Sequence, residues 1–271
     1  SKKLTAWNTQ IIVVALISVI KKKVKQSINN FLNNNFFIEI CYFYSYIASI
    51  SYRVYLKFMS VKINYNKNLP KKNSSNIVLF CDEKFTISGL KKHISGSEFS
   101  FISDLIKTRD IKKNILSFDI SSKRKIILVA LKENIKNSDL ENLGGKFYDI
   151  FKNLKQNNYN LNSDTVSNKL SHVISYFLHG IKLKSYSFEK YKTKKNKQEI
   201  SIFVTGKNKP SIKDQIKFKA IEEGTFYTRD LVSEPGNVLH PDEYAKRINT
   251  LKKFGLKIVV YDEKKLKKLG M

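Results

Sequence analysis

The stretch KIILVAL at residues 125–131 points to the fold class of this chain. A short run of β-branched and aliphatic residues without polar alternation is typical of a strand buried on both faces of a sheet. A period-two pattern at VKINY (61–65) places Val61, Ile63 and Tyr65 on one face and predicts another strand. Three further apolar runs predict strands at NIVLF (76–80), NILSF (114–118) and EISIFV (199–204).

Helix-length segments separate these strands. Residues 138–156 begin with Ser138 as the expected N-cap and Glu141 three residues later, which is a capping-box spacing. Residues 163–181 are expected to form a second helix that ends at Gly180. Apolar residues recur at helical spacing in both segments: Leu140, Leu143, Phe147, Ile150, Phe151 and Leu154 in the first, and Val166, Leu170, Val173, Phe177 and Leu178 in the second. Alternating strands and helices predict an α/β domain whose sheet is mostly covered.

A third helix is expected from Ser211 to about residue 232. Its predicted apolar stripe consists of Ile216, Ala220, Tyr227 and Leu231, and Gly224 within it would allow close approach of another backbone.

A break in the helical pattern follows at Pro235, since proline disfavours the α region for the residue before it. Gly236 and Asn237 tolerate unusual dihedral angles. The next helix is expected to begin with His240 at the N-cap and Pro241 at the first helical position. The run LKIVVYD (256–262) then predicts a strand that opens a second α/β unit.

The composition is strongly basic, with 50 Lys and Arg against 23 Asp and Glu and a net charge of +27. Such a charge attracts nucleic acid, anionic lipid or acidic proteins without a dedicated site. The lysines are scattered, however, and Lys, Asn, Ile, Phe and Tyr are the residues that A/T-rich codons encode. Cys41 and Cys81 stand far apart in apolar surroundings, which excludes a disulfide framework or a cysteine-based metal site and favours a reducing compartment.

Residues 1–58 differ from the rest of the chain. They hold eight basic residues and one acid, Glu39, and contain apolar stretches at 11–20 and 36–52. The first stretch is too short to span a bilayer, and Glu39 and several hydroxyl groups interrupt the second. Three interpretations stay open for this extension: a membrane hairpin, a disordered appendage, or sequence translated upstream of a true start at Met59.

Residues 185–198, SYSFEKYKTKKNKQ, are polar and basic. From their chemistry we expect a solvated connector. Nucleic-acid contact through Tyr186, Phe188 and Tyr191 is a minor alternative.

Near the C-terminal end, TRDLVSEPGNVLHPDEYA and the later LGM resemble the junction between the N-terminal and catalytic domains of leucyl (cytosol) aminopeptidases. ENLGGKFYDIF and SYSFEKYKTKK resemble N-domain segments of the same family, and the resemblance covers roughly residues 59–271. Ser233 stands where the family usually has Asn, and His240 stands where it usually has Thr. The residues that keep the junction motif are Arg229, Asp230, Leu231, Pro235, Asn237, Pro241, Leu269, Gly270 and Met271.

The resemblance implies a fold and an activity. Its fold would be a mixed sheet flanked by helices, similar to a macro domain, followed by a linker helix and the truncated start of a second α/β domain. Its activity would be that of a cytoplasmic, hexameric exopeptidase that removes N-terminal residues from peptides with two divalent metal ions, Mn or Zn. The metal ligands of the family, including an N-T-D-A-E-G-R element, lie beyond the Leu-Gly-Met segment. We therefore expect an N-terminal fragment with no catalytic or metal-binding residue of its own and no bound metal.

No independent active site is expected either. His172 and His179 are seven residues apart, too far along a helix to chelate one ion, and His93 and His240 have no partner at a suggestive spacing. GGK at 144–146 lacks the other elements of a P-loop, and no G-x-S-x-G elbow occurs.

The expected organisation is an extension (1–58), an aminopeptidase N-terminal domain (59–210), a linker helix (211–232) and the start of a catalytic domain (233–271). The parent protein would act on peptides as a homo-hexamer, whereas this chain alone would be inactive. The alternative is a stand-alone basic module that binds nucleic acid or a protein partner. Membrane association is expected only if residues 1–58 are genuine.

Overall fold

The computed structural model describes residues 61–65, 76–108, 113–154, 157–166, 172–193 and 199–271. All of them lie in the unit Met59–Met271, one of the two into which the chain divides. The predicted extension over residues 1–58 lies outside the described residues.

Six strands form one sheet in the order β1-β6-β5-β2-β4-β3. Neighbouring strands are parallel except β3, which is antiparallel to β4. Five of the six predicted strands are confirmed, and β5 is a further strand that the sequence did not indicate. The strands are β1 (Val61–Tyr65), β2 (Asn76–Asp82), β3 (Ile115–Ser121), β4 (Arg124–Leu131), β5 (Asn158–Asn162) and β6 (Ile200–Thr205).

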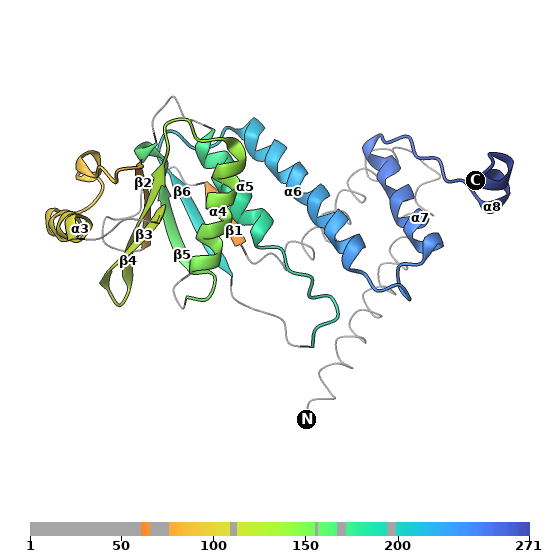
Figure 1. Cartoon of the computed structure of the whole chain (residues 1–271), viewed down its shortest axis with the longest axis horizontal. Coiled ribbons are helices and arrows are strands. Elements are labelled where there is room, and N and C mark those ends of the chain that lie inside the picture. The colour runs from red at the N-terminus through yellow and green to blue at the C-terminus, as the bar shows by residue number, and fades with distance from the viewer. Residues whose placement is uncertain (1–60, 66–75, 109–112, 155–156, 167–171, 194–198) are drawn as a thin grey trace, which may run out of the picture. The chain divides into compact units, whose positions relative to one another are not determined.

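Helices cover both faces of this mixed sheet, which confirms the predicted fold class (Figure 1). Helix α3 (Gly96–Thr108) packs on one face through Ile102, and α4 (Asn137–Phe151) and α5 (Val173–Lys184) pack on the other. Side chains of a strand alternate between the two faces, so Val78 and Leu79 belong to different core clusters. Two-sided burial explains why β2 and β4 read as unbroken apolar runs.

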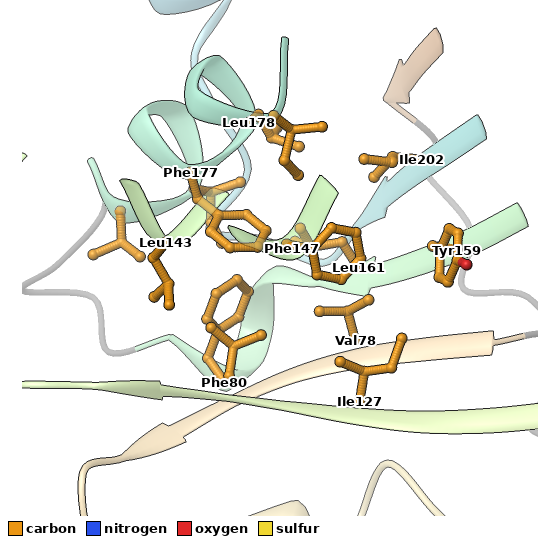
Figure 2. Packing of buried hydrophobic residues seen from close by; sticks show 14 of the residues in the cluster. Val78, Phe80, Ile127, Leu143, Phe147, Tyr159, Leu161, Phe177, Leu178 and Ile202 are labelled. Carbon is orange, nitrogen blue, oxygen red and sulfur yellow. The ribbon is translucent and has the colours of Figure 1, made fainter. Parts of the chain in front are cut away.

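Aromatic rings fill the core between the sheet and α4 and α5 (Figure 2). The Phe177 ring lies edge-on to Phe80 of β2 at a centroid distance of 5.4 Å, and Phe147 lies 5.6 Å from both Phe177 and Tyr159. Such offset and edge-to-face pairs are the favoured arrangements of aromatic rings. This cluster fixes the two helices on the sheet.

Two glycines set the separation of α4 and α5. A Cβ atom on Gly144 would lie 2.0 Å from the Phe177 carbonyl oxygen, and one on Gly180 would lie 2.0 Å from the Glu141 carbonyl oxygen. Because α5 continues to Lys184, Gly180 lies inside it, and the prediction that Gly180 ends a helix is wrong. The same crossing explains the first glycine of the GG pair in ENLGGKF, Gly144, whereas a Cβ atom on Gly145 would make only an ordinary contact with Lys184.

The predicted starts of both helices are also wrong. Helix α4 begins at Asn137 with Lys136 at the N-cap, so Ser138 already lies in the first turn and forms no capping box. Residues Ser163–Thr165 form a short 3-10 helix, η2, because the Asn162 side chain accepts a hydrogen bond from the Asp164 amide. Helix α5 begins only at Val173.

Helix α6 (Ile212–Ser233) confirms the predicted third helix, and the Ser211 side chain caps its N-terminus. The predicted stripe is largely wrong, because Phe218, Glu222 and Phe226 are buried while Ile216 is 64% exposed. Position 224 faces open space, so no close backbone contact explains its glycine.

The remaining elements are η1 (Ser88–Leu90), α7 (Pro241–Asn249), η4 (Thr250–Phe254) and α8 (Glu263–Lys268). Residues 256–262 form no strand, so that prediction is wrong. A strand needs a neighbouring edge for its backbone groups, and none of the described strands pairs with this run. Val259 and Val260 are accordingly more than half exposed. Within the described part of the chain, no helix combines the length and apolarity that a membrane span requires.

Candidate functional site

Arg229 and Asp230 hold the end of α6 against the last turn of α5 and the segment that follows it. Arg229 Nη1 donates to the Leu183 carbonyl oxygen at 2.6 Å, and its guanidinium carbon lies 5.4 Å from the Tyr186 ring centroid. The Tyr186 hydroxyl donates to Asp230 Oδ1 at 2.8 Å. Burial raises the pKa of Tyr186, and the hydrogen bond to Asp230 adds to that rise. Leu231 is buried beside them, so all three motif residues have packing roles.

Glu234 is the centre of the polar contacts at this junction. Its Oε1 accepts hydrogen bonds from Lys190 Nζ and, at 3.1 Å, from Arg247 Nη1, while its Oε2 accepts one from the Tyr191 hydroxyl. The side chain is only 3% exposed. Hydrogen bonds from Lys190 and Tyr191, followed by Arg247, lower the pKa of Glu234 to about 2. The carboxylate therefore joins three separate segments of the chain.

Pro235 starts a tight turn between α6 and α7. Its carbonyl oxygen accepts hydrogen bonds from the Val238 and Leu239 amides, both at 2.9 Å. Gly236 and Asn237 are exposed, and neither adopts a positive φ, so the unusual dihedral angles expected of them are absent at these two described positions. Asn237 and Pro235 contribute a turn to this junction without bringing a reactive group to it.

The start of α7 follows the prediction. His240 occupies the N-cap in an extended conformation, Pro241 lies in the first turn, and Asp242 and Glu243 complete that turn. The acidic pair interacts favourably with the helix dipole. Pro241 is thus a helix-starting residue.

Gly270 ends α8 in the left-handed conformation, with φ 74°. Its amide donates to the Lys267 carbonyl oxygen and the Met271 amide donates to that of Leu266, which together form a Schellman motif. Glycine suits this position because it adopts a positive φ without strain.

A buried polar cluster anchors α6 to α5 and β1. His179 Nδ1 lies 3.2 Å from Glu222 Oε1, and Lys182 Nζ donates to the Val61 carbonyl oxygen at 2.5 Å. Burial lowers the pKa of Lys182 and raises that of Tyr65 to about 12, with the Glu222 charge opposing the first shift and adding to the second. His179 is thus a core residue paired with a carboxylate.

The other histidines lie apart from this cluster and from one another. His172 precedes α5 and contacts the Tyr176 ring at 6.2 Å, whereas His93 Nδ1 lies 2.9 Å from Asn162 Nδ2. The structure brings none of the four histidines together at a common centre among the residues it describes.

A groove with a cavity volume of about 650 Å³ runs along α4 beside the end of α5. Its lining mixes acidic and basic groups, among them Glu83, Lys132, Asp139, Lys146 and Arg229. Asp149 there pairs with Lys184 at 3.0 Å and with Lys152 at 2.8 Å. This balanced lining has no cluster of one charge that would select an ionic ligand.

The described residues do not fit a two-metal centre. A pair of divalent ions needs several converging carboxylate, imidazole or thiolate ligands. No three His, Cys, Asp or Glu side chains of the described ranges converge in that way. No catalytic step is therefore assigned to these residues.

Sequence reasoning missed the partners of the junction. Lys190, Tyr191 and Tyr186 belong to a segment expected to be a solvated connector, yet they hold α6. The mixture of Tyr, Lys and Glu in that segment is the one signal that could have indicated a polar contact surface. Glu234 and Arg247 carry no such signal in the sequence, since charged residues next to a turn are usually solvated.

Curated relatives match parts of this chain. The probable cytosol aminopeptidase of Nitrobacter winogradskyi is 29% identical over 211 residues, 72% of this chain and 42% of that protein. The one from Brucella anthropi is 41% identical over 101 residues, 34% of this chain and 20% of that protein. The one from Phytoplasma mali is 39% identical over 105 residues, 36% and 21% respectively. The chain thus spans less than half the length of these relatives, and no protein-family model matches it.

Many solved structures share the fold, among them the following two. A variant of tomato leucine aminopeptidase superposes with a TM-score of 0.59 at 16% identity, covering 78% of this chain and 46% of that one. The bottromycin maturation enzyme BotP, solved in complex with Mn, gives a TM-score of 0.50 at 15% identity and covers 73% and 40%. At such low identity these likenesses concern the arrangement of helices and strands.

Proposed function

Because the chain belongs to the leucyl (cytosol) aminopeptidase family, we propose that it forms the N-terminal portion of a metal-dependent peptidase that removes N-terminal amino acids from peptides. The observation that carries this proposal is the interlocking of two family-like segments. Residues 185–191 and the junction at 226–248 are far apart in the sequence, yet they share the Tyr186–Asp230 and Tyr191–Glu234 hydrogen bonds.

In the proposed enzyme, the described residues would have a structural role and the metal chemistry would lie elsewhere. They supply a covered sheet, a linker helix and the first helix beyond it, and they bring no set of metal ligands together within the described ranges. Two divalent ions, Mn or Zn, would supply a polarised carbonyl and an activated water in the complete enzyme. A homo-hexamer and a cytoplasmic location are parts of the same proposal, the second supported by the names of the relatives.

An activity assay tests the proposal in two arms. In the first, the purified 271-residue chain is incubated with a leucyl amide and Mn²⁺ or Zn²⁺, and we expect no release of leucine. In the second, residues 59–271 replace the matched region of the Nitrobacter winogradskyi relative, and we expect metal-dependent release.

The matched control is the same chimera with Gly180→Val, which would disrupt the α4–α5 contact and abolish folding of the grafted part. Release of leucine by the chain alone would overturn its proposed inactivity. A folded chimera with no activity would overturn the proposed role.

The alternative, a stand-alone basic binding module, rests on the net charge of +27 alone. Binding to nucleic acid that falls steeply between low and physiological salt, without sequence preference, would identify it as a general charge effect. The aminopeptidase relatives do not favour this alternative.

A further inference from the structure

The helix that follows the Pro235 turn has little apolar attachment to the rest of the chain. No residue of α7 is buried. Its described contacts with α6 include the Tyr227 hydroxyl donating to the Arg247 carbonyl oxygen at 3.1 Å and Arg247 Nη1 donating to Glu234 at 3.1 Å. The orientation of α7 therefore depends on polar contacts.

Glu234 is suited to fix that orientation. Three donors converge on its two carboxylate oxygens, and the side chain is almost fully covered. Hydrogen bonds to a charged group are roughly twice as strong as neutral ones. The donors are more exposed, Lys190 at 50% and Arg247 at 25%, so the contact is specific to the covered carboxylate.

The partners of Glu234 are themselves held in place. Arg247 Nε donates to Glu243 Oε1 one helical turn away at 3.0 Å, which orients the guanidinium towards Glu234. Lys190 and Tyr191 follow Tyr186, whose hydroxyl is bound to Asp230 on α6. The segment after α5 and the face of α7 thus both contact the end of α6, and Glu234 is bound from both sides.

We propose that Glu234 is a positioning residue whose carboxylate sets the orientation of α7, and of the chain beyond α7, relative to the sheet domain. The consequence of this orientation for peptide hydrolysis rests on the proposed function, because α7 would be the first helix of the catalytic portion. The geometric role stands independently of that activity.

Spin-label distances test this role in the full chain. Labels are attached at Ala220→Cys on α6 and Lys246→Cys on α7, both exposed positions, with Cys41 and Cys81 replaced by serine. We expect one narrow distance distribution with Glu234 present. Glu234→Gln, which keeps the size and removes the charge, should broaden it about twofold.

Amide exchange supplies a local readout. In Glu234→Gln, the Val238 and Leu239 amides of the turn should exchange about tenfold faster, while the β4 amides stay unchanged. The matched control is Glu263→Gln, which removes an exposed pair with Lys267 on α8 and should change neither measurement.

A double-mutant cycle separates positioning from general destabilisation. Arg247→Met should reproduce the broadening, and Glu234→Gln with Arg247→Met should broaden the distribution no further than either change alone. If Glu234→Gln prevents folding, Tyr191→Phe removes one hydrogen bond at a half-exposed ring and carries the same test.

Unchanged distances and unchanged turn exchange in Glu234→Gln or Tyr191→Phe would overturn the proposal. Additive broadening in the double variant would also overturn it. Placed in the active chimera, Glu234→Gln should lower kcat more than it changes KM. An inactive chimera would count against the proposed function alone, since the distance measurement needs no activity.

Discussion

Residues 126–131 of β4 and residues 256–261 near the C-terminal end are similarly apolar, but they have different environments. Ile127, Leu128 and Val129 are fully buried, whereas Val259 and Val260 are 61% and 52% exposed. β4 has β2 and β3 as neighbours, and no described strand pairs with 256–261. A β-branched run therefore becomes a strand only where an edge on another segment accepts its backbone groups.

The largest loss of stability should come from a substitution in the aromatic core that covers the sheet. Phe177→Ala removes the ring that contacts Phe80 and Phe147, and we expect a loss of about 3–5 kcal/mol in the free energy of unfolding. Urea unfolding followed by far-ultraviolet circular dichroism measures it. A loss below about 1 kcal/mol would contradict the described packing.

A smaller loss of stability should come from the crossing of α4 and α5. Gly180→Ala forces a Cβ atom against the Glu141 backbone, and we expect a loss of about 1–3 kcal/mol. Its matched control is Gly224→Ala in α6, where the added methyl group meets open space and the helix should gain about 1 kcal/mol. The two substitutions are chemically identical, so equal effects in urea unfolding would refute the close crossing.

Acidification should weaken the junction around Glu234 even at pH values where most of its carboxylate is still charged. The folded pKa of Glu234 is about 2, below the ordinary value of 4.5, so its carboxylate contributes stability that is complete above pH 4.5. That contribution is lost progressively as the pH falls from 4.5 to 2. The groups that face it, Lys190, Tyr191 and Arg247, stay protonated in this window.

Amide exchange at residues 238–239, corrected for the intrinsic rate and compared with β4, measures this effect. Protection should fall below pH 4.5 in the native chain and stay level in Glu234→Gln. Equal pH profiles in the two proteins would show that other carboxylates control the turn.

The smallest effect should come from the exposed run. Val260→Ser should change the free energy of unfolding by less than about 0.5 kcal/mol, because the side chain is half exposed in the described chain. Val129→Ser in β4 is the matched substitution and should cost several times more. A large effect of Val260→Ser would mean that this run is covered in solution.

The strands were predictable where burial on both faces left an unbroken apolar run. β5 reads NYNLN and gave no such signal, since asparagine is uncommon in strands. Asn160 and Asn162 are nevertheless buried in the middle of the sheet, where the Asn162 side chain bonds the backbone of η2. Polar side chains that serve the next turn therefore concealed a central strand.

The site was predictable as a motif but not as a set of contacts. Local backbone preferences, which act within a few residues, indicate the end of one helix at Pro235 and the start of the next at His240 and Pro241. The bonds from Tyr186 and Lys190 to the end of α6 span 44 residues, and no local pattern specifies which charged groups meet at that range. Family resemblance marked both segments without indicating that they touch.

The pairing of β1 with β6 has a consequence for synthesis on the ribosome. Val61 pairs with Ile200, so β1 has no neighbour in this sheet until 139 further residues have been made. At typical elongation rates of 5–20 residues per second, that wait is about 7–28 s. The β3–β4 hairpin at the other edge can close as soon as it emerges. During translation, β1 must therefore remain without its native neighbour, and must avoid incorrect pairing, until β6 has been synthesised.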